Sequence, residues 1–86
     1  MQKIDIYTKG YCPYCKRALA LLEAKSASYN NIEIDKNPDL RPAMIERANG
    51  GSTVPQIFIG DTHVGGCDDL FALESAGKLD ALLAGE

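Results

Sequence analysis

Two cysteines separated by two residues stand where a strand pattern gives way to a helical pattern. Residues 3–8 alternate as a strand does, and apolar residues at positions 18, 19, 21 and 22 form a helical stripe. Between these segments lies the motif Cys12-Pro13-Tyr14-Cys15. Pro13 suits the first position of a helix, because the N–H that proline lacks would have no helical partner there. The chain therefore has to fold with a thiol pair at the beginning of a helix that directly follows a strand.

That position favours a reactive thiolate at Cys12. The first turn of a helix has backbone N–H groups without partners and carries partial positive charge, and Lys9 adds a cation three residues upstream. Cys15 lies one turn further on, on the same helix face. Two thiols at this spacing indicate a redox pair, in which Cys12 attacks and Cys15 resolves. A buried apolar cysteine is the alternative for Cys12.

The size and charge of the chain limit the classes of function. Its 86 residues are expected to form a single domain, 1–86. The net charge of −3 argues against nucleic-acid binding, which requires a basic face. We expect no signal peptide and no membrane span, and hence a cytoplasmic protein whose thiols stay reduced. Three cysteines with one close pair fit reactive thiols better than a disulfide framework.

The rest of the chain predicts an α/β order of elements. A first helix at about 12–25 and a second strand at 29–34 give a parallel pair with a right-handed crossover. Asn37 and Pro38 suit the cap and first position of a second helix, which begins later if Pro42 must lie in its first turn. A hairpin at 55–64, a helix that ends at Gly77 and a terminal turn or helix at 79–83 follow.

Three short motifs occur in order along almost the whole chain: Cys12-Pro13-Tyr14-Cys15, Thr53-Val54-Pro55 and Gly65-Gly66-Cys67-Asp68. Together they resemble the glutaredoxin family, in particular its small bacterial dithiol members. The resemblance implies a thioredoxin-like α/β fold, with a four-stranded mixed sheet of order 2-1-3-4 flanked by helices. It also implies a monomeric enzyme of cell redox homeostasis that uses glutathione as its reducing co-substrate.

In such an enzyme the Cys12 thiolate attacks a protein–glutathione mixed disulfide, releases the protein thiol and keeps the glutathionyl group. A second glutathione then removes that group as glutathione disulfide, so this monothiol cycle does not need Cys15. Protein disulfides require Cys15, which resolves the mixed disulfide at Cys12 and leaves a Cys12–Cys15 bridge. The implied partners are glutathione and proteins that carry a glutathionyl group or a disulfide.

The second motif offers main-chain groups to glutathione. The resemblance implies a cis bond between Val54 and Pro55, which leaves the Val54 N–H and C=O next to Thr53 free to pair with an extended peptide. Glutathione is such a peptide, and its cysteinyl backbone would dock there beside Cys12. Without that bond, Pro55 would simply begin a strand.

The third motif offers an anion site at a helix start. Gly66 allows a close approach of the backbone, and the N–H groups of Cys67 and Asp68 suit the γ-glutamyl carboxylate. The Asp68 carboxylate would pair with the γ-glutamyl ammonium, or would only cap the helix. Lys9 would meet the glycine carboxylate and Tyr14 would cover the ligand, unless both are ordinary surface side chains.

Three residues near these motifs remain open. Cys67 is interpreted as a small residue beside the glutathione site, with a regulatory thiol as the alternative. Gln56 lies in or beside the site, depending on the strand register. His63 is interpreted as a surface side chain.

Metal binding is the competing class of function, although we expect no metal. Cys12, Cys15, Cys67 and His63 would suffice for tetrahedral zinc, but their spacing does not follow paired knuckles. A second alternative is a [2Fe–2S] scaffold or carrier, in which Cys12 of two chains and two glutathiones hold the cluster; Pro13 disfavours it. A thioredoxin is disfavoured because the chain has no Trp, which that family carries before its first cysteine.

Overall fold

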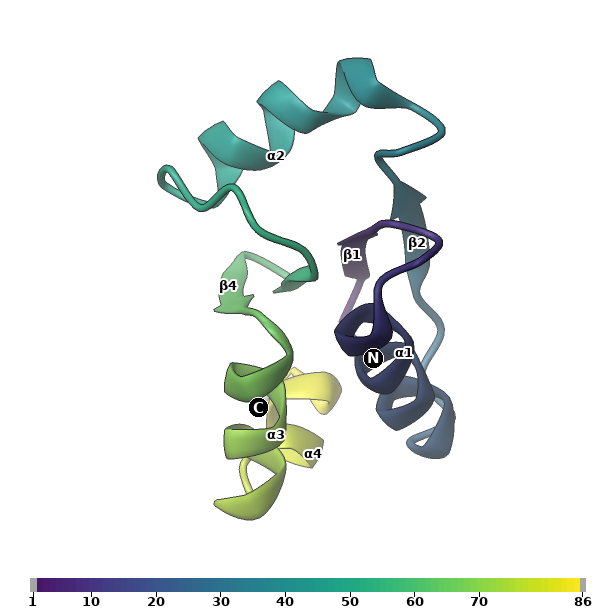
Figure 1. Cartoon of the computed structure of the whole chain (residues 1–86). Helices are drawn as coiled ribbons and strands as arrows, with labels where there is room; N and C mark the ends of the chain where they lie inside the picture. The colour runs from purple at the N-terminus through teal and green to yellow at the C-terminus, as the bar shows by residue number, and fades with distance from the viewer. Residues whose placement is uncertain (1, 86) are drawn as a thin grey trace.

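A four-stranded mixed sheet forms the centre of the structure (Figure 1). The computed structural model describes residues 2–85. Its strands are β1 (Ile4–Thr8), β2 (Asn30–Glu33), β3 (Gln56–Ile59) and β4 (Thr62–Gly65). Their order across the sheet is β2-β1-β3-β4; β1 and β2 are parallel, and the other two pairs are antiparallel. The predicted strand order and the thioredoxin-like α/β architecture are thereby confirmed.

The helical segments cover both faces of this sheet. They are α1 (Pro13–Ala24), the 3-10 helix η1 (Pro38–Leu40), α2 (Arg41–Arg47), α3 (Cys67–Ser75) and α4 (Leu79–Ala84). No helix within residues 2–85 is both long and apolar enough to cross a membrane.

The predicted second helix is divided in two. It begins as η1 at Pro38, and α2 starts only at Arg41, which leaves Pro42 in the first turn of the α-helix, where proline is tolerated. Asn37 precedes η1 but makes no side-chain cap; its Nδ2 donates to the Glu33 carbonyl oxygen at 3.2 Å. The expected side-chain cap at Asn37 is therefore wrong, because this amide closes the turn after β2 instead.

The central strand β1 is buried on both faces, so the sheet separates two cores. On one face Ile4 and Ile6 belong to an apolar cluster with Leu22 of α1, Leu70 of α3 and Leu79 of α4. Figure 1 shows α2 apart from these three helices. The larger core therefore fixes α1 relative to α3, and the first residues of these two helices contain the cysteine motif and the third motif.

The face of the sheet toward α2 has a smaller and more polar core. Tyr7 and Phe58 pack there with Met44 of α2, and their rings meet edge to face at 5.8 Å. Asp5 is also buried, and its carboxylate accepts from Arg47 Nη1 at 2.8 Å. The Arg47 guanidinium, which lies over the Phe58 ring and pairs with a buried carboxylate, thus attaches α2 to the sheet.

Candidate active site

Cys12 is the residue that caps α1. Its backbone is extended, with φ −86° and ψ 113°, and α1 begins directly after it at Pro13. The Cys15 N–H donates to Cys12 Sγ at 3.2 Å. This contact uses one of the N–H groups that the first helical turn leaves without a partner, and it favours negative charge on the sulfur. Cys12 thus lies at the cap position of α1 rather than inside its first turn.

Cys15 occupies a different environment from Cys12. It is 1% exposed, whereas Cys12 is partly exposed, and neither cysteine is in a disulfide. Burial, together with the neighbouring Cys12 side chain, raises the pKa of Cys15 to about 12. Cys15 is therefore a protonated thiol near neutral pH.

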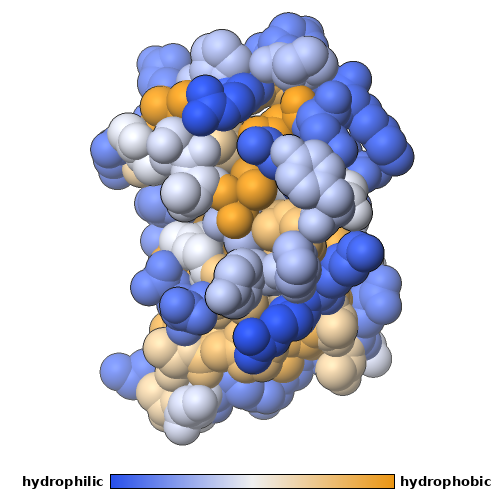
Figure 2. Space-filling model, in the orientation of Figure 1, coloured by the Kyte–Doolittle hydropathy of each residue, from blue (hydrophilic) through white to orange (hydrophobic). Residues whose placement is uncertain are grey.

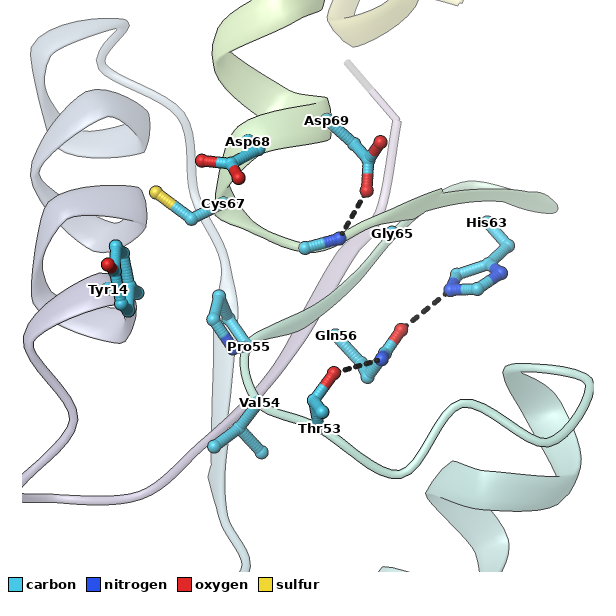
Figure 3. A pocket seen from close by; sticks show the side chains of 11 residues that line it. Tyr14, Thr53, Val54, Pro55, Gln56, His63, Gly65, Cys67, Asp68 and Asp69 are labelled. Carbon is cyan, nitrogen blue, oxygen red and sulfur yellow. Dashed lines mark hydrogen bonds between the residues drawn. The ribbon is translucent and has the colours of Figure 1, made fainter.

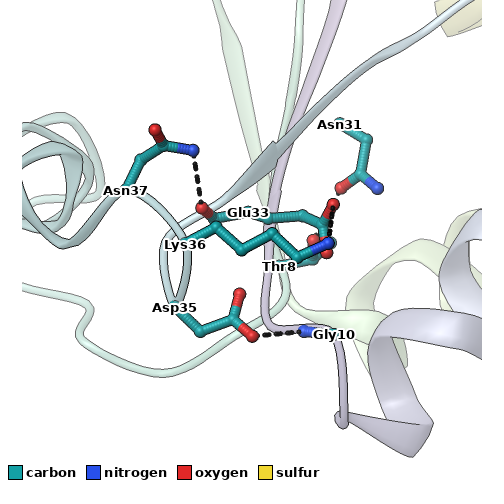
Figure 4. Close-up of polar contacts among 7 residues, drawn as sticks. All are labelled: Thr8, Gly10, Asn31, Glu33, Asp35, Lys36 and Asn37. Carbon is teal, nitrogen blue, oxygen red and sulfur yellow. Dashed lines mark hydrogen bonds and ion pairs between the residues drawn. The ribbon is translucent and has the colours of Figure 1, made fainter.

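The loop before Cys12 is held from β2 and the turn that follows it (Figure 4). The Gly10 N–H donates to Asp35 Oδ2 at 3.1 Å, and the Cys12 N–H donates to the Lys9 carbonyl oxygen at 3.1 Å. Thr8, at the end of β1, is buried and donates to Asn31 Oδ1 at 2.6 Å. These contacts position the backbone of the loop and leave the Lys9 ammonium without an ion pair among residues 2–85.

The second motif faces Cys12. The Val54–Pro55 peptide bond is cis, as the resemblance implies, and the Cys12 thiol lies 3.9 Å from the Val54 carbonyl oxygen. A cavity of about 390 Å³ is lined by Val54 and Pro55, although not by Cys12 itself (Figure 3). Its lining contains every residue predicted to bind glutathione except Lys9, and four others: Gln56, His63, Gly65 and Asp69.

The start of α3 forms another wall of the cavity. Gly66 is the N-cap, and its N–H donates to Asp69 Oδ2 at 2.9 Å. The expectation that Asp68 could be the cap is wrong, because Asp69, at the third helical position, reaches back to the chain before the helix. The Asp68 side chain is exposed and lines the cavity.

Gly65 allows this arrangement. Its φ of +114° lies in the region that favours glycine, and a Cβ at this position would overlap the Asp69 carboxylate. The sequence predicted a close approach of the backbone to a ligand at Gly65 and Gly66, but not the contact between Gly65 and the Asp69 carboxylate. The pattern of a capping box with glycine in the cap position was the available signal for Asp69.

Cys67 is buried at the first position of α3, and burial raises its pKa. The Arg17 guanidinium opposes that shift, and it also lies 5.5 Å from the centre of the Phe71 ring. A thiol that is buried and protonated near neutral pH suits the interpretation of Cys67 as a small residue beside the site.

The face shown in Figure 2 has apolar areas at its centre and across its lower part, among hydrophilic side chains. Tyr11 and Tyr14 next to the cysteines are both exposed, at 72% and 57%. Within residues 2–85, no three His, Cys, Asp or Glu side chains are grouped so as to hold a metal ion. The zinc alternative therefore has no support from the geometry.

A capping thiol, a buried second thiol one turn later and a facing cis-proline loop define a thiol–disulfide oxidoreductase of the thioredoxin-like fold. Comparison with known proteins narrows this class. The family model described as Glutaredoxin matches residues 4–64. This chain belongs to the glutaredoxin family.

Relatives and solved structures agree with this family. The chain is 56% identical to a glutaredoxin of Pseudomonas aeruginosa, over 98% of this chain and 99% of that protein. It is 54% identical to glutaredoxin 3 of Escherichia coli, over 96% of this chain and 99% of that protein. A crystal structure of a buckwheat glutaredoxin–glutathione complex is 34% identical, with a TM-score of 0.87, over 95% of this chain and 76% of that one. These similarities identify an enzyme with thiol–disulfide oxidoreductase activity.

Proposed function

We propose that this enzyme depends on glutathione and reduces protein–glutathione mixed disulfides through Cys12. The observation that carries the proposal is the contact of the Cys12 thiol with the Val54 carbonyl oxygen, at 3.9 Å, next to the cavity. A sulfur bound to Cys12 would lie beside main-chain groups that can pair with a short extended peptide. The buckwheat relative in complex with glutathione supports this choice of ligand.

The proposed monothiol cycle has two exchange steps. The Cys12 thiolate attacks the glutathione sulfur of the mixed disulfide, a Cys12–glutathione bond forms, and the protein leaves as a thiolate that takes a proton from solvent. A second glutathione, as its thiolate, then attacks the glutathione sulfur on Cys12. Glutathione disulfide leaves, and the Cys12 thiolate is regenerated with the help of the Cys15 N–H at 3.2 Å.

Residues around the cavity would hold the tripeptide along its length. The Val54 main chain would pair with the cysteinyl unit, beside Thr53 and Pro55. The N–H groups of Cys67 and Asp68 would bind the γ-glutamyl carboxylate, because the first turn of a helix leaves its N–H groups without helical partners.

The ends of the ligand would meet opposite charges. The exposed Asp68 carboxylate would pair with the γ-glutamyl ammonium, since Asp69 rather than Asp68 is used as the cap. The Lys9 ammonium would meet the glycine carboxylate, and exposed Tyr14 would cover the bound sulfur. Gly66 would let the ligand approach the backbone closely.

Cys15 would serve protein disulfides. After Cys12 forms a mixed disulfide with a protein, the Cys15 sulfur would attack Cys12 Sγ, release the protein thiolate and leave a Cys12–Cys15 bridge. The position of Cys15 one helical turn from Cys12 makes this attack intramolecular, which offsets the small thiolate fraction that a pKa of about 12 gives Cys15 in the reduced protein at neutral pH. We further propose that the enzyme acts as a monomer in the cytoplasm, where thiols stay reduced.

Reduction of a glutathionylated peptide, coupled to glutathione oxidation, tests the proposal in three proteins. Wild type and Cys15→Ser are expected to turn over, and Cys12→Ser is expected to be inactive. Loss of protein-disulfide reduction in Cys15→Ser would complete the pattern. Full activity of Cys12→Ser, or no activity of reduced and folded wild type with glutathione, would contradict the proposal.

A further inference from the structure

The cavity continues past Pro55 to a pair of polar side chains, Gln56 of β3 and His63 of β4 (Figure 3). Across the two strands His63 is opposite Phe58, which is two residues from Gln56 and therefore on the same face of β3. The His63 Nε2 lies 2.7 Å from Gln56 Oε1. Because the amide oxygen can only accept, the imidazole donates this hydrogen bond.

Gln56 connects this ring to the loop before Pro55. It is 5% exposed, and its Nε2 lies 3.5 Å from Thr53 Oγ1, at the limit of a hydrogen bond. The same amide lies against Gly51, where an added Cβ would come within 3.0 Å of Gln56 Nε2. Both polar atoms of the buried amide therefore have partners: Oε1 contacts β4, and Nε2 contacts the loop at 51–53.

The ring of His63 is itself held in one orientation. It stacks on Phe58 with 4.8 Å between ring centres and an interplanar angle of 21°. The guanidinium of Arg47 lies 4.1 Å from the centre of the same Phe58 ring. This stack fixes the plane of the imidazole and leaves its Nε2 pointing at Gln56 (Figure 3).

From these contacts we infer that His63 and Gln56 are positioning residues for the Thr53–Val54 segment, and through it for glutathione bound at Cys12. The His63 ring is hydrogen-bonded to the Gln56 amide, and the same amide lies at hydrogen-bond distance from the Thr53 hydroxyl. Thr53 is followed by Val54, whose carbonyl oxygen lies near Cys12 Sγ. Neither residue needs to touch the reacting sulfur atoms. The inference rests on the proposed function, since it concerns the segment that would pair with glutathione.

A role in positioning predicts a specific kinetic change. The Thr53–Val54 segment would contact the glutathionyl group equally in the ground state and the transition state, so its displacement raises KM and leaves kcat unchanged. His63 is an exposed residue on an edge strand, where substitutions have small effects on folding. The effect of a His63 substitution on KM can therefore be measured in a protein that stays folded.

The test compares two substitutions of His63 with a matched control on the same strand. His63→Phe keeps a ring that can stack on Phe58 but removes the donor, whereas His63→Gln restores an N–H at similar reach. Thr62→Val, one residue before His63 and outside the cavity, is the control. With a glutathionylated peptide, His63→Phe is expected to raise KM about fivefold, the factor that one hydrogen bond of ordinary net strength provides. His63→Gln and Thr62→Val are expected to keep the wild-type KM, and all three variants the wild-type kcat.

A double-mutant cycle tests whether the two residues act together. Gln56→Met has similar length and no polar group, and it is expected to raise KM by a similar factor. The double variant with His63→Phe is expected to show no further increase, because the connection is already broken. Two independent, multiplying effects, or an unchanged KM in His63→Phe, would overturn the inference.

Failure of the proposed function would give a different result. In that case folded wild type itself would show no glutathione-coupled turnover. The backbone amide chemical shifts of Thr53 and Val54 would then test the positioning alone, with a change expected in His63→Phe and none in Thr62→Val. Unchanged shifts in His63→Phe would overturn the inference independently of the activity.

Discussion

The two faces of the sheet differ in how they support the site. The face toward α1, α3 and α4 is covered by an apolar core, whereas the face toward α2 contains a half-buried ion pair and stacked rings. The apolar core fixes the starts of α1 and α3, which carry Cys12 and the proposed anion site. The polar face holds the loop at 51–55 through directed contacts. Apolar packing thus fixes the two helix starts, and hydrogen bonds hold the loop at 51–55 that faces them.

The largest effect is expected from a cavity in the apolar core. Leu22→Ala removes a side chain of α1 that is 0% exposed, and we expect the free energy of unfolding to fall by about 3 kcal/mol. Urea denaturation measures this loss. Leu40→Ala, at a position that is 39% exposed, is the control, with a change below about 0.5 kcal/mol. Equal effects of the two substitutions would contradict the assignment of the apolar core as the main support.

Breaking the ion pair on the opposite face is expected to cost less. Arg47→Met leaves the Asp5 carboxylate buried without its partner, and Arg47 is partly exposed, so we expect a loss of about 2 kcal/mol. The double variant Asp5→Leu/Arg47→Met removes both charges and is expected to recover most of the loss. Thermal unfolding of the three proteins measures this. A double variant that is no more stable than Arg47→Met would show that the unpaired charge is not the cause.

Substitutions of the neighbouring residues Asp68 and Asp69 are expected to differ: one should weaken glutathione binding, and the other should lower stability. Asp69→Ala removes the partner of the Gly66 N–H and should lower the free energy of unfolding by about 1 kcal/mol. Asp68→Ala should leave stability unchanged and raise KM for glutathione by about tenfold, because the proposed ammonium contact exists in both ground and transition states. Steady-state kinetics and urea denaturation of both variants distinguish the roles. An unchanged KM in Asp68→Ala would remove this residue from the binding site.

The smallest effect concerns the pH dependence of stability. The pKa of Cys15 rises from 9.0 to about 12 in the folded protein, so the unfolded chain releases this proton first. Stability from this thiol is fully present below about pH 9 and is lost as pH rises toward about 12. Under reducing conditions, wild type should therefore lose about 0.4 kcal/mol more than Cys15→Ser between about pH 8 and about pH 9. Identical pH profiles for the two proteins would contradict a protonated, buried Cys15.

Local chemistry explains which parts of this structure could be predicted from the sequence. The helix start at Cys12 depends on neighbouring residues, as do the hairpin after Pro55 and the glycines before α3. The sequence predicted these elements with small errors in the residues at which they begin and end. The division between η1 and α2 was anticipated as a later start, because Pro42 is compatible only with a first turn.

Contacts between distant residues explain the features that were missed. A register shift between Ile57 and Phe58 decides which residues of β4 lie beside Gln56, and no local pattern shows such a bulge. His63 is exposed, as predicted, but it also lines the cavity and contacts Gln56, which the sequence did not indicate. The role of Asp69 was overlooked because Asp68 and Asp69 are chemically equal; only the capping-box spacing, with Gly66 as N-cap and Asp69 three residues later, distinguishes them.

The most direct test of the account is to locate the glutathionyl group on the protein. Reduced Cys15→Ser, treated with glutathione disulfide near neutral pH and analysed by peptide mass spectrometry, lacks the thiol that would resolve the adduct. The account predicts one glutathionyl group, on Cys12, with Cys67 unmodified because it is buried and protonated. A glutathionyl group found on Cys67, or a folded protein that accepts none, would contradict the claim that Cys12 is the nucleophile of a glutathione site.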